Sequence, residues 1–154
     1  MRLDIQVQPI RPSMTTPPVS EVIIIEEIPV DDENDEKGVI ALVCINRPNK
    51  LNALNADIVS GLKALCNWAE KQNEIRLVII KGAEPLQPEE GKRAKPNAFV
   101  AGADISEFTG KKSNDIRQSF KHNAWEAIWN LSKPTIAMID GFTLGGGLEV
   151  ACSC

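Results

Sequence analysis

The chain has 154 residues, of which 43% are hydrophobic, and 21 acidic against 17 basic side chains give it a net charge of −4. This length suits one compact domain, and an acidic balance without a basic block excludes a typical nucleic-acid-binding surface. No apolar run approaches the roughly 18 residues that a membrane helix requires, so we expect a soluble protein with no membrane partner.

The cysteines and the single histidine give little support to a metal centre. Cys44, Cys66, Cys152 and Cys154 lie in apolar runs, with no CxxC pair and no histidine at ligand spacing. We therefore predict reduced core thiols and no bound metal, and we interpret His122 as a surface residue of a helix.

The amino-terminal part divides into a tail and a hairpin. Residues 1–20 contain four prolines, and we interpret them as a disordered tail in preference to an organellar transit peptide. Val22–Ile28 and Gly38–Asn46 are short β-branched runs separated by an acidic stretch, which predicts two strands joined by a solvated loop. The folded part is therefore expected to span residues 21–154.

Residues 53–71 show the period of an amphipathic helix. Apolar residues recur there at every third or fourth position: Leu54, Ile58, Leu62, Leu65 and Ala69. The next apolar run, Leu77–Lys81, is continuous, which predicts a strand covered on both faces in a parallel sheet. The order strand, helix, strand indicates an α/β fold.

A proline-rich segment, 83–97, is predicted to be a surface loop. The short strand Ala98–Val100 follows it and leads into the turn Ala101–Asp104. Asp104 with Glu107 three positions later matches a capping pattern for a helical turn.

A second helical pattern begins at Ser113 and continues to Leu131. Its apolar face is predicted to contain Ile116, Phe120, Ala124, Ala127, Ile128 and Leu131, with Trp125 and Trp129 beside it. Pro134 ends the helix, Thr135–Ile139 is predicted to be a buried strand, and Gly141–Gly147 is a glycine-rich turn that opens a final helix.

Two of these turns are candidates for chemistry. A glycine-rich turn at the start of a helix presents backbone N–H groups without intrahelical acceptors, although such a turn also serves simple chain reversal or phosphate binding. In a parallel sheet the turn Ala101–Asp104 is expected to emerge at the same carboxyl edge. Two backbone donors that converge from separate loops can form an oxyanion hole.

Three segments carry a specific resemblance. Asn46–Leu54 (NRPNKLNAL), Phe99–Phe108 (FVAGADISEF) and Lys133–Glu149 (KPTIAMIDGFTLGGGLE) resemble, in order, the signature segments of the enoyl-CoA hydratase/isomerase (crotonase) family. The resemblance covers about residues 20–154. It implies an α/β, crotonase-like (ClpP/crotonase) fold with a stacked ββα-type core.

The resemblance also implies individual site residues. The N–H groups of Ala103 and Gly146 would form the oxyanion hole for the carbonyl of an acyl-CoA thioester. The implied substrate-binding residues are Ala103, Asp104, Ile105, Ser106 and Gly146. Arg47 and Lys50 are either phosphate partners of the CoA moiety or ordinary surface charges, and no cofactor is expected beyond the coenzyme A of the substrate.

Glu149 lies three residues after Gly146 and matches the first catalytic glutamate of the hydratase branch, which acts on the water that adds at C3. Its alternative role is a favourable charge at a helix N-terminus. The implied activity is hydration of trans-2-enoyl-CoA in fatty-acid β-oxidation. A Δ3,Δ2-enoyl-CoA isomerase or another acyl-CoA enzyme of the family is the alternative.

The pattern departs from the family after residue 154, where relatives of the hydratase type carry a second catalytic carboxylate. We therefore expect an incomplete crotonase core, and a truncated, inactive or subunit-associating fragment is a further hypothesis. For a complete form the resemblance implies a homo-oligomer, either a trimer or a hexamer.

Overall fold

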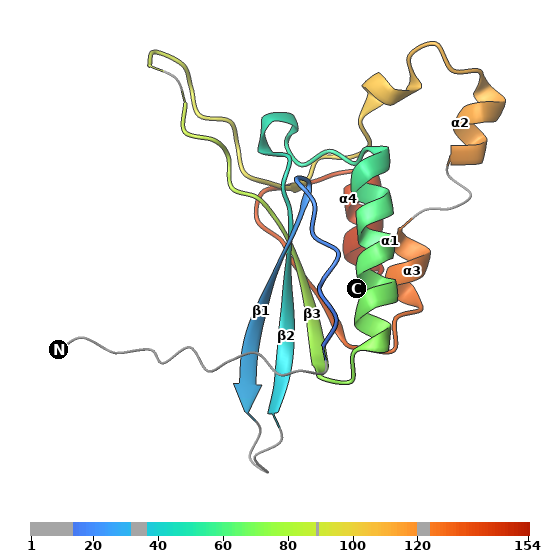
Figure 1. The fold of residues 1–154 in the computed structure, drawn as a ribbon. Coiled ribbons are helices and arrows are strands. Elements are labelled where there is room, and N and C mark those ends of the chain that lie inside the picture. Colours follow the sequence, from blue (N-terminus) through green and yellow to red (C-terminus); the bar gives the residue numbers. More distant parts are fainter. Residues whose placement is uncertain (1–13, 32–36, 89, 120–123) are drawn as a thin grey trace.

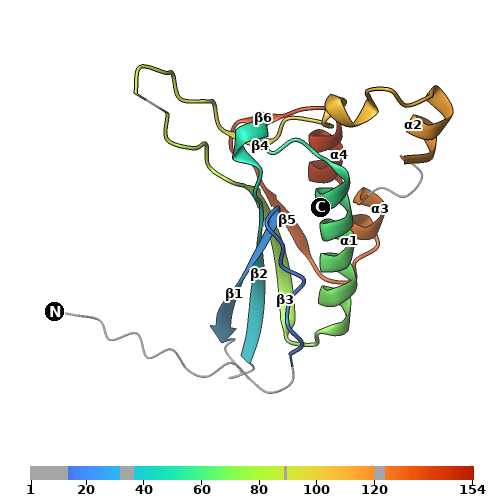
Figure 2. The same cartoon turned by 45° about the horizontal axis from the view of Figure 1, so that its top comes forward.

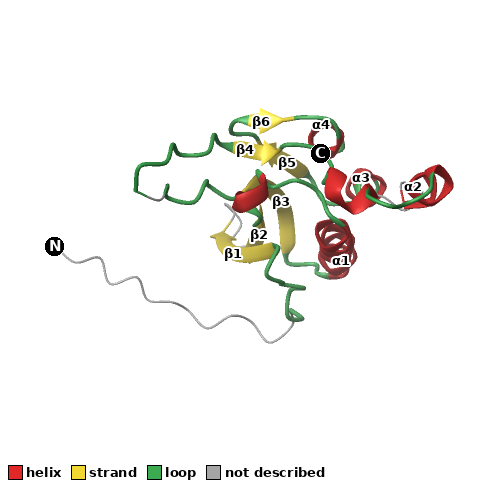
Figure 3. Cartoon of the chain, turned by 90° about the horizontal axis from the view of Figure 1, so that it is seen from above, coloured by secondary structure: helices red, strands yellow, loops and turns green. Residues whose placement is uncertain are grey.

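The structure is a computed structural model that describes residues 14–31, 37–88, 90–119 and 124–154. Its elements, in chain order, are β1 (Ile23–Asp31), β2 (Lys37–Ile45), η1 (Pro48–Lys50), α1 (Ala56–Lys71), β3 (Ile75–Gly82), β4 (Ala98–Val100), η2 (Ile105–Phe108), α2 (Ser113–Ser119), α3 (Trp125–Trp129), β5 (Thr135–Met138), β6 (Phe142–Thr143) and α4 (Gly146–Cys152). A four-stranded sheet has the order β1-β2-β3-β5. Helices α1, α3 and α4 lie on the same side of it (Figures 1 and 3).

The first two strands form the predicted hairpin. β1 and β2 pair antiparallel from Ile23 opposite Ile45 to Asp31 opposite Lys37. β2 then pairs parallel with β3, and β3 pairs parallel with β5. The prediction of an α/β fold is confirmed, whereas the solvated loop was predicted over residues that lie partly outside the described ranges.

Helix α1 buries the predicted stripe, because Ile58, Leu62, Leu65 and Ala69 are all fully buried against the sheet. The helix begins at Ala56, three residues later than expected. The side chain of Asn55 accepts a hydrogen bond from the Ile58 N–H at 3.0 Å and so caps the helix. Leu54, directly before this cap, forms a β-bridge with Ala103 and lines the candidate site.

Two strands are less buried than predicted. In β3 buried Val78 and Ile80 alternate with half-buried neighbours, and in β5 Ile136 and Met138 are 48% and 45% exposed. The expectation of burial on both faces is wrong here, because in the described part of the chain the helices cover one face of the sheet. Alternate side chains therefore point away from them.

The thiols also differ from the prediction of four core residues. Cys66 is buried, Cys44 and Cys154 are half-buried, and Cys152 is exposed; all four are free. Burial raises the pKa of the Cys66 thiol to about 11. A buried thiol with a raised pKa is a poor nucleophile, so Cys66 serves packing.

The second predicted helix is present as α2 and α3. Ala124 and Ile128 are buried as expected, and Trp129 is exposed. Phe120 and His122 lie outside the described residues, so their predicted positions are not tested. No helix within the described ranges is long and apolar enough to cross a membrane.

Most of the predicted tail, residues 1–13, also lies outside the described ranges. The described residues 14–20 run beside α1, where the Thr15 carbonyl accepts a hydrogen bond from Trp68 Nε1 at 2.9 Å. The amide of Gln72 completes this contact, since its Nε2 donates to Thr15 Oγ1 at 2.8 Å. The division into a tail and a domain stays a prediction.

A second, two-stranded sheet positions the site. β4 and β6 pair in parallel, and β6 lies in the segment that was predicted to be only a glycine-rich turn. The small sheet lies at one end of the large one, next to α4 (Figure 2). Because the two strands run in parallel, the turns that follow them emerge side by side.

Candidate active site

The two glycine turns are in direct contact. Gly102 has a φ of +113° and Gly145 a φ of +48°, which are conformations that side-chain-bearing residues rarely adopt. A Cβ on Gly102 would lie 3.4 Å from the Leu144 carbonyl oxygen, and the Leu144 N–H donates to the Val100 carbonyl at 3.1 Å. The turns converge as predicted, although they belong to the β4–β6 pair and not to the large sheet.

The direction of the Ala103 N–H follows from an isolated parallel bridge between Leu54 and Ala103. The Leu54 N–H donates to the Gly102 carbonyl at 2.8 Å, and the Asp104 N–H donates to the Leu54 carbonyl at 2.8 Å. In a parallel bridge the peptide groups of the middle residue point away from the partner. The Ala103 N–H is therefore directed away from Leu54.

Gly146 is the second predicted donor. It is the first residue of α4, where backbone N–H groups have no acceptor within the helix. Ala103, Gly145 and Gly146 line the same cavity, which has a volume of about 590 Å³. The structure thus brings the two predicted donors together at one cavity.

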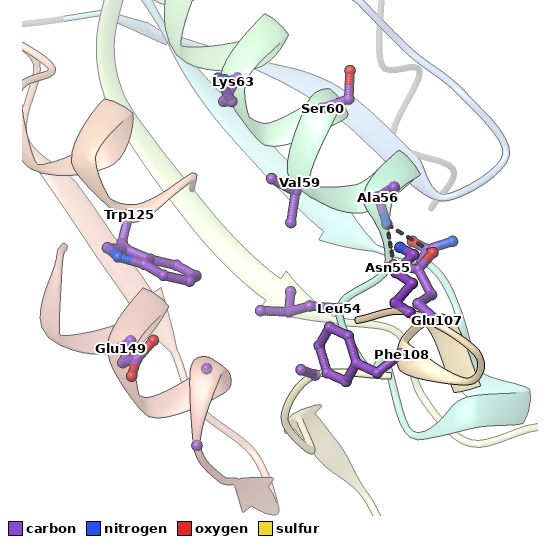
Figure 4. Close-up of a pocket in the computed structure, with 14 residues that line it drawn as sticks. Leu54, Asn55, Ala56, Val59, Ser60, Lys63, Glu107, Phe108, Trp125 and Glu149 are labelled. Carbon is purple, nitrogen blue, oxygen red and sulfur yellow. Dashed lines mark hydrogen bonds between the residues drawn. The ribbon is translucent and has the colours of Figure 1, made fainter. Parts of the chain in front are cut away.

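Glu149 lines this cavity as well, from the first turn of α4. Figure 4 shows its exposed carboxylate beside Trp125 of α3, with Val59 of α1 and Leu54 on the opposite side. The cavity lining therefore combines apolar side chains, the two lysines Lys63 and Lys111, and one carboxylate close to the glycine turn, that of Glu149. This is the composition that general-base chemistry on a bound apolar ligand needs.

Asp104 faces away from the cavity. It is 8% exposed, its Oδ2 lies 2.7 Å from Arg47 Nη2, and its Oδ1 accepts hydrogen bonds from the Ser106 N–H and hydroxyl at 3.0 and 2.6 Å. Ser106 and Ile105 also lie outside the cavity lining, and Ile105 is 80% exposed. Substrate contacts by Asp104, Ile105 and Ser106 stay a prediction without support from the cavity.

The hydrogen bond from the Ser106 hydroxyl and the Arg47 guanidinium hold the pKa of Asp104 at about 2, below its ordinary 3.8. A carboxyl whose pKa is lowered by folding contributes stability above its unfolded pKa, and the contribution disappears as the pH falls toward the folded pKa. At pH 6 we expect the urea midpoint of the wild-type protein to lie above that of the Asp104→Asn variant. The difference between the two midpoints should narrow between about pH 4 and 2. A gap that is equal at pH 6 and pH 3 would contradict this.

Glu107 has a role that the sequence did not indicate. The predicted capping pattern pairs it with Asp104, but both Glu107 carboxylate oxygens accept a hydrogen bond from the Ala56 N–H at 3.1 Å (Figure 4). Glu107 therefore caps α1, a different helix from the one predicted. The sequence pattern, an acidic residue three positions after a capping Asp, indicated a cap but did not identify the Ala56 N–H as its partner.

The basic residues near the site differ in their contacts. Arg47 is engaged, since Nη1 donates to the Ala53 carbonyl at 3.2 Å in addition to the Asp104 ion pair. Lys50 is exposed at the end of η1. Within the described ranges no cluster of three or more His, Cys, Asp or Glu side chains could hold a metal ion.

The chain is thus an α/β protein in which Ala103, Gly146 and Glu149 line one cavity, next to the turns that follow the parallel strands β4 and β6. A family model described as enoyl-CoA hydratase/isomerase matches residues 40–154. The chain belongs to this family, which confirms the resemblance found in its three signature segments.

Individual relatives agree with the family. A short-chain-enoyl-CoA hydratase of Clostridium acetobutylicum is 37% identical over 122 residues, covering 78% of this chain and 42% of the relative. An enoyl-CoA hydratase structure from Bacillus anthracis superimposes with a TM-score of 0.70 and 25% identity, over 86% of this chain and 45% of that one.

An enoyl-CoA hydratase/carnithine racemase structure from Magnetospirillum magneticum is similar at a TM-score of 0.68 and 31% identity, over 88% of this chain and 45% of that one. The crotonase-like fold is thus confirmed over the part that this chain contains. The chain spans less than half the length of these relatives.

Proposed function

We propose that the protein is an enoyl-CoA hydratase, which adds water across the double bond of a trans-2-enoyl-CoA as in fatty-acid β-oxidation. The observation that carries the proposal is that Ala103, Gly146 and Glu149 line the same cavity. These are the three residues to which the family resemblance assigns the oxyanion hole and the general base. The relative from Clostridium acetobutylicum supports hydration, and a short acyl chain in particular.

The two backbone donors would act on the thioester carbonyl. Hydrogen bonds from the Ala103 and Gly146 N–H groups polarise the conjugated enoyl thioester, so that C3 becomes electrophilic. Addition of oxygen at C3 moves the electron pair of the double bond onto the carbonyl oxygen as an enolate. Donors aimed at that oxygen stabilise the enolate more than the ground state, which is the condition for catalysis.

Glu149 would accept the proton of the attacking water. Its carboxylate is on the same cavity wall as the Gly146 donor, one helical turn away, so a water held by it can reach C3 of a bound thioester. C2 must then acquire a proton to complete the addition, and the family resemblance assigns this transfer to the second catalytic carboxylate, which hydratase-type relatives carry after the segment matched here. Glu107, the other carboxylate of the lining, is not assigned to this step because it caps α1.

The test is hydration of crotonyl-CoA, followed by loss of enoyl absorbance, with the 154-residue chain and its Glu149→Gln variant. We expect the substitution to lower kcat by about 10³-fold, because the amide cannot accept the proton but keeps the shape of the side chain. Glu90→Gln, in the exposed loop 83–97, is the matched control and should leave the rate unchanged.

Other results would favour other functions. Isomerisation of a 3-enoyl-CoA without hydration would favour the isomerase alternative. Binding of crotonyl-CoA without either reaction would overturn hydratase activity for this chain and favour a fragment that binds or associates without catalysis. Assembly into a trimer or hexamer stays a prediction.

A further inference from the structure

The segment before α1 clamps the turn that carries the first donor. Three backbone hydrogen bonds join residues 51–54 to residues 101–104: Ala101 N–H to the Leu51 carbonyl at 3.1 Å, Leu54 N–H to the Gly102 carbonyl at 2.8 Å, and Asp104 N–H to the Leu54 carbonyl at 2.8 Å. These bonds fix the turn along the side that faces residues 51–54. A further constraint on the turn comes from side chains.

The side-chain constraint is the ion pair of Arg47 with Asp104. The Arg47 guanidinium contacts Asp104 at 2.7 Å through Nη2 and the Ala53 carbonyl at 3.2 Å through Nη1. The Arg47 backbone is held as well, because its N–H donates to Asn52 Oδ1 at 3.0 Å. One planar guanidinium group therefore links Ala53, in the segment before α1, to Asp104, in the turn that carries the donor. A lysine cannot reproduce this double contact.

Burial gives this pair its weight. The side chains of Arg47 and Asp104 are 20% and 9% exposed, so solvent and salt screen their attraction less than that of a surface pair. Neither residue lines the cavity, as a residue in direct contact with the ligand would. We therefore expect the pair to act on the site through the backbone next to Asp104.

That backbone is the Ala103 peptide. Asp104 directly follows Ala103, so its ion pair with Arg47 anchors the carboxyl side of Ala103. On the amino side, the Gly102 carbonyl, which shares a peptide with the Ala103 N–H, accepts a hydrogen bond from the Leu54 N–H at 2.8 Å. A donor must be held within about 0.5 Å and 10–20° of its productive direction to act on an oxyanion. Release of the Asp104 side chain removes the side-chain anchor next to the donor and leaves only the backbone hydrogen bonds to residues 51–54 on this side.

We propose that the Arg47–Asp104 ion pair is a positioning device that holds the Ala103 N–H in the direction from which it donates to the thioester oxyanion. The catalytic part of this inference rests on the proposed function. It assigns both residues to the scaffold of the donor, in place of the phosphate and acyl contacts considered from the sequence.

The kinetic test compares Asp104→Asn and Arg47→Lys with the exposed control Asp115→Asn. We expect kcat for crotonyl-CoA hydration to fall about tenfold in both variants of the pair while KM changes less than about twofold, because the donor acts mainly in the transition state. The infrared carbonyl stretch of the bound thioester should return toward its value in solution. Unchanged kcat and unchanged carbonyl stretch in folded variants would overturn the proposal.

A second measurement needs no substrate. The ¹⁵N order parameter of the Ala103 amide should drop in Asp104→Asn and, to a smaller extent, in Arg47→Lys, while that of Gly146 on the other turn stays constant. This result with an inactive wild-type chain would reject the hydratase and keep the positioning device. An active wild-type chain whose Ala103 order parameter is unaffected in both variants would reject the device and keep the hydratase.

Discussion

Replacement of Gly147 by alanine is expected to destabilise the protein by about 3 kcal/mol and to separate the two donor turns. A Cβ at this position would lie 2.1 Å from the Val100 carbonyl oxygen and 2.8 Å from Val100 Cβ. The obstacle is the backbone of β4 and cannot rotate away, so α4 must move outward. Since Gly146 is in α4 and Ala103 follows β4, this movement widens the distance between the donors.

Urea unfolding of wild type and Gly147→Ala measures the loss in stability, and binding of crotonyl-CoA measures the change at the site. Gly91→Ala is the matched control, because Gly91 has a φ of +80° but no atom within 4 Å of an added Cβ. The control should lose only the roughly 1–2 kcal/mol of a left-handed non-glycine residue. Because Gly147 has no positive φ, an unchanged stability of Gly147→Ala would show that helix α4 accommodates the methyl group without steric cost.

Periodicity predicted those elements whose burial is decided by their own sequence. The helix α1 and the strands β1 and β2 each carry their own apolar pattern, and each forms within about three residues of the predicted bounds. Burial on both faces of β3 and β5 could not be inferred in this way. It depends on which layers cover the sheet, and that is a property of distant segments.

The site shows the same division. Ala103, Gly146 and Glu149 were identified through the resemblance of short signature segments to the family, and the structure places the three residues at one cavity. The partners of Arg47, Asn52 and Glu107 were not identified, since each contacts a segment between 31 and 57 residues away. Polar side chains that meet across such distances leave no periodic signal in the sequence.

Asn52→Asp is expected to cost about 4 kcal/mol, although the substitution is isosteric. Asn52 is buried, and its Nδ2 donates to the Ala83 carbonyl at 2.9 Å and to the Ala98 carbonyl at 2.8 Å. A carboxylate keeps the acceptor for the Arg47 N–H but replaces both donors by an oxygen that repels the two carbonyls. The backbone is not the cause, because the φ of +56° at this position suits Asp as well as Asn.

The loss should appear in the urea midpoint and should shrink as the pH is lowered, since a protonated carboxyl can donate one of the two lost hydrogen bonds. Asn67→Asp, on the exposed face of α1, is the matched control and should change stability by less than about 0.5 kcal/mol. Because Ala98 begins β4, the same variant should loosen the strand that leads to Ala103. A stability close to that of the control would mean that the β4 strand is held without the Asn52 amide.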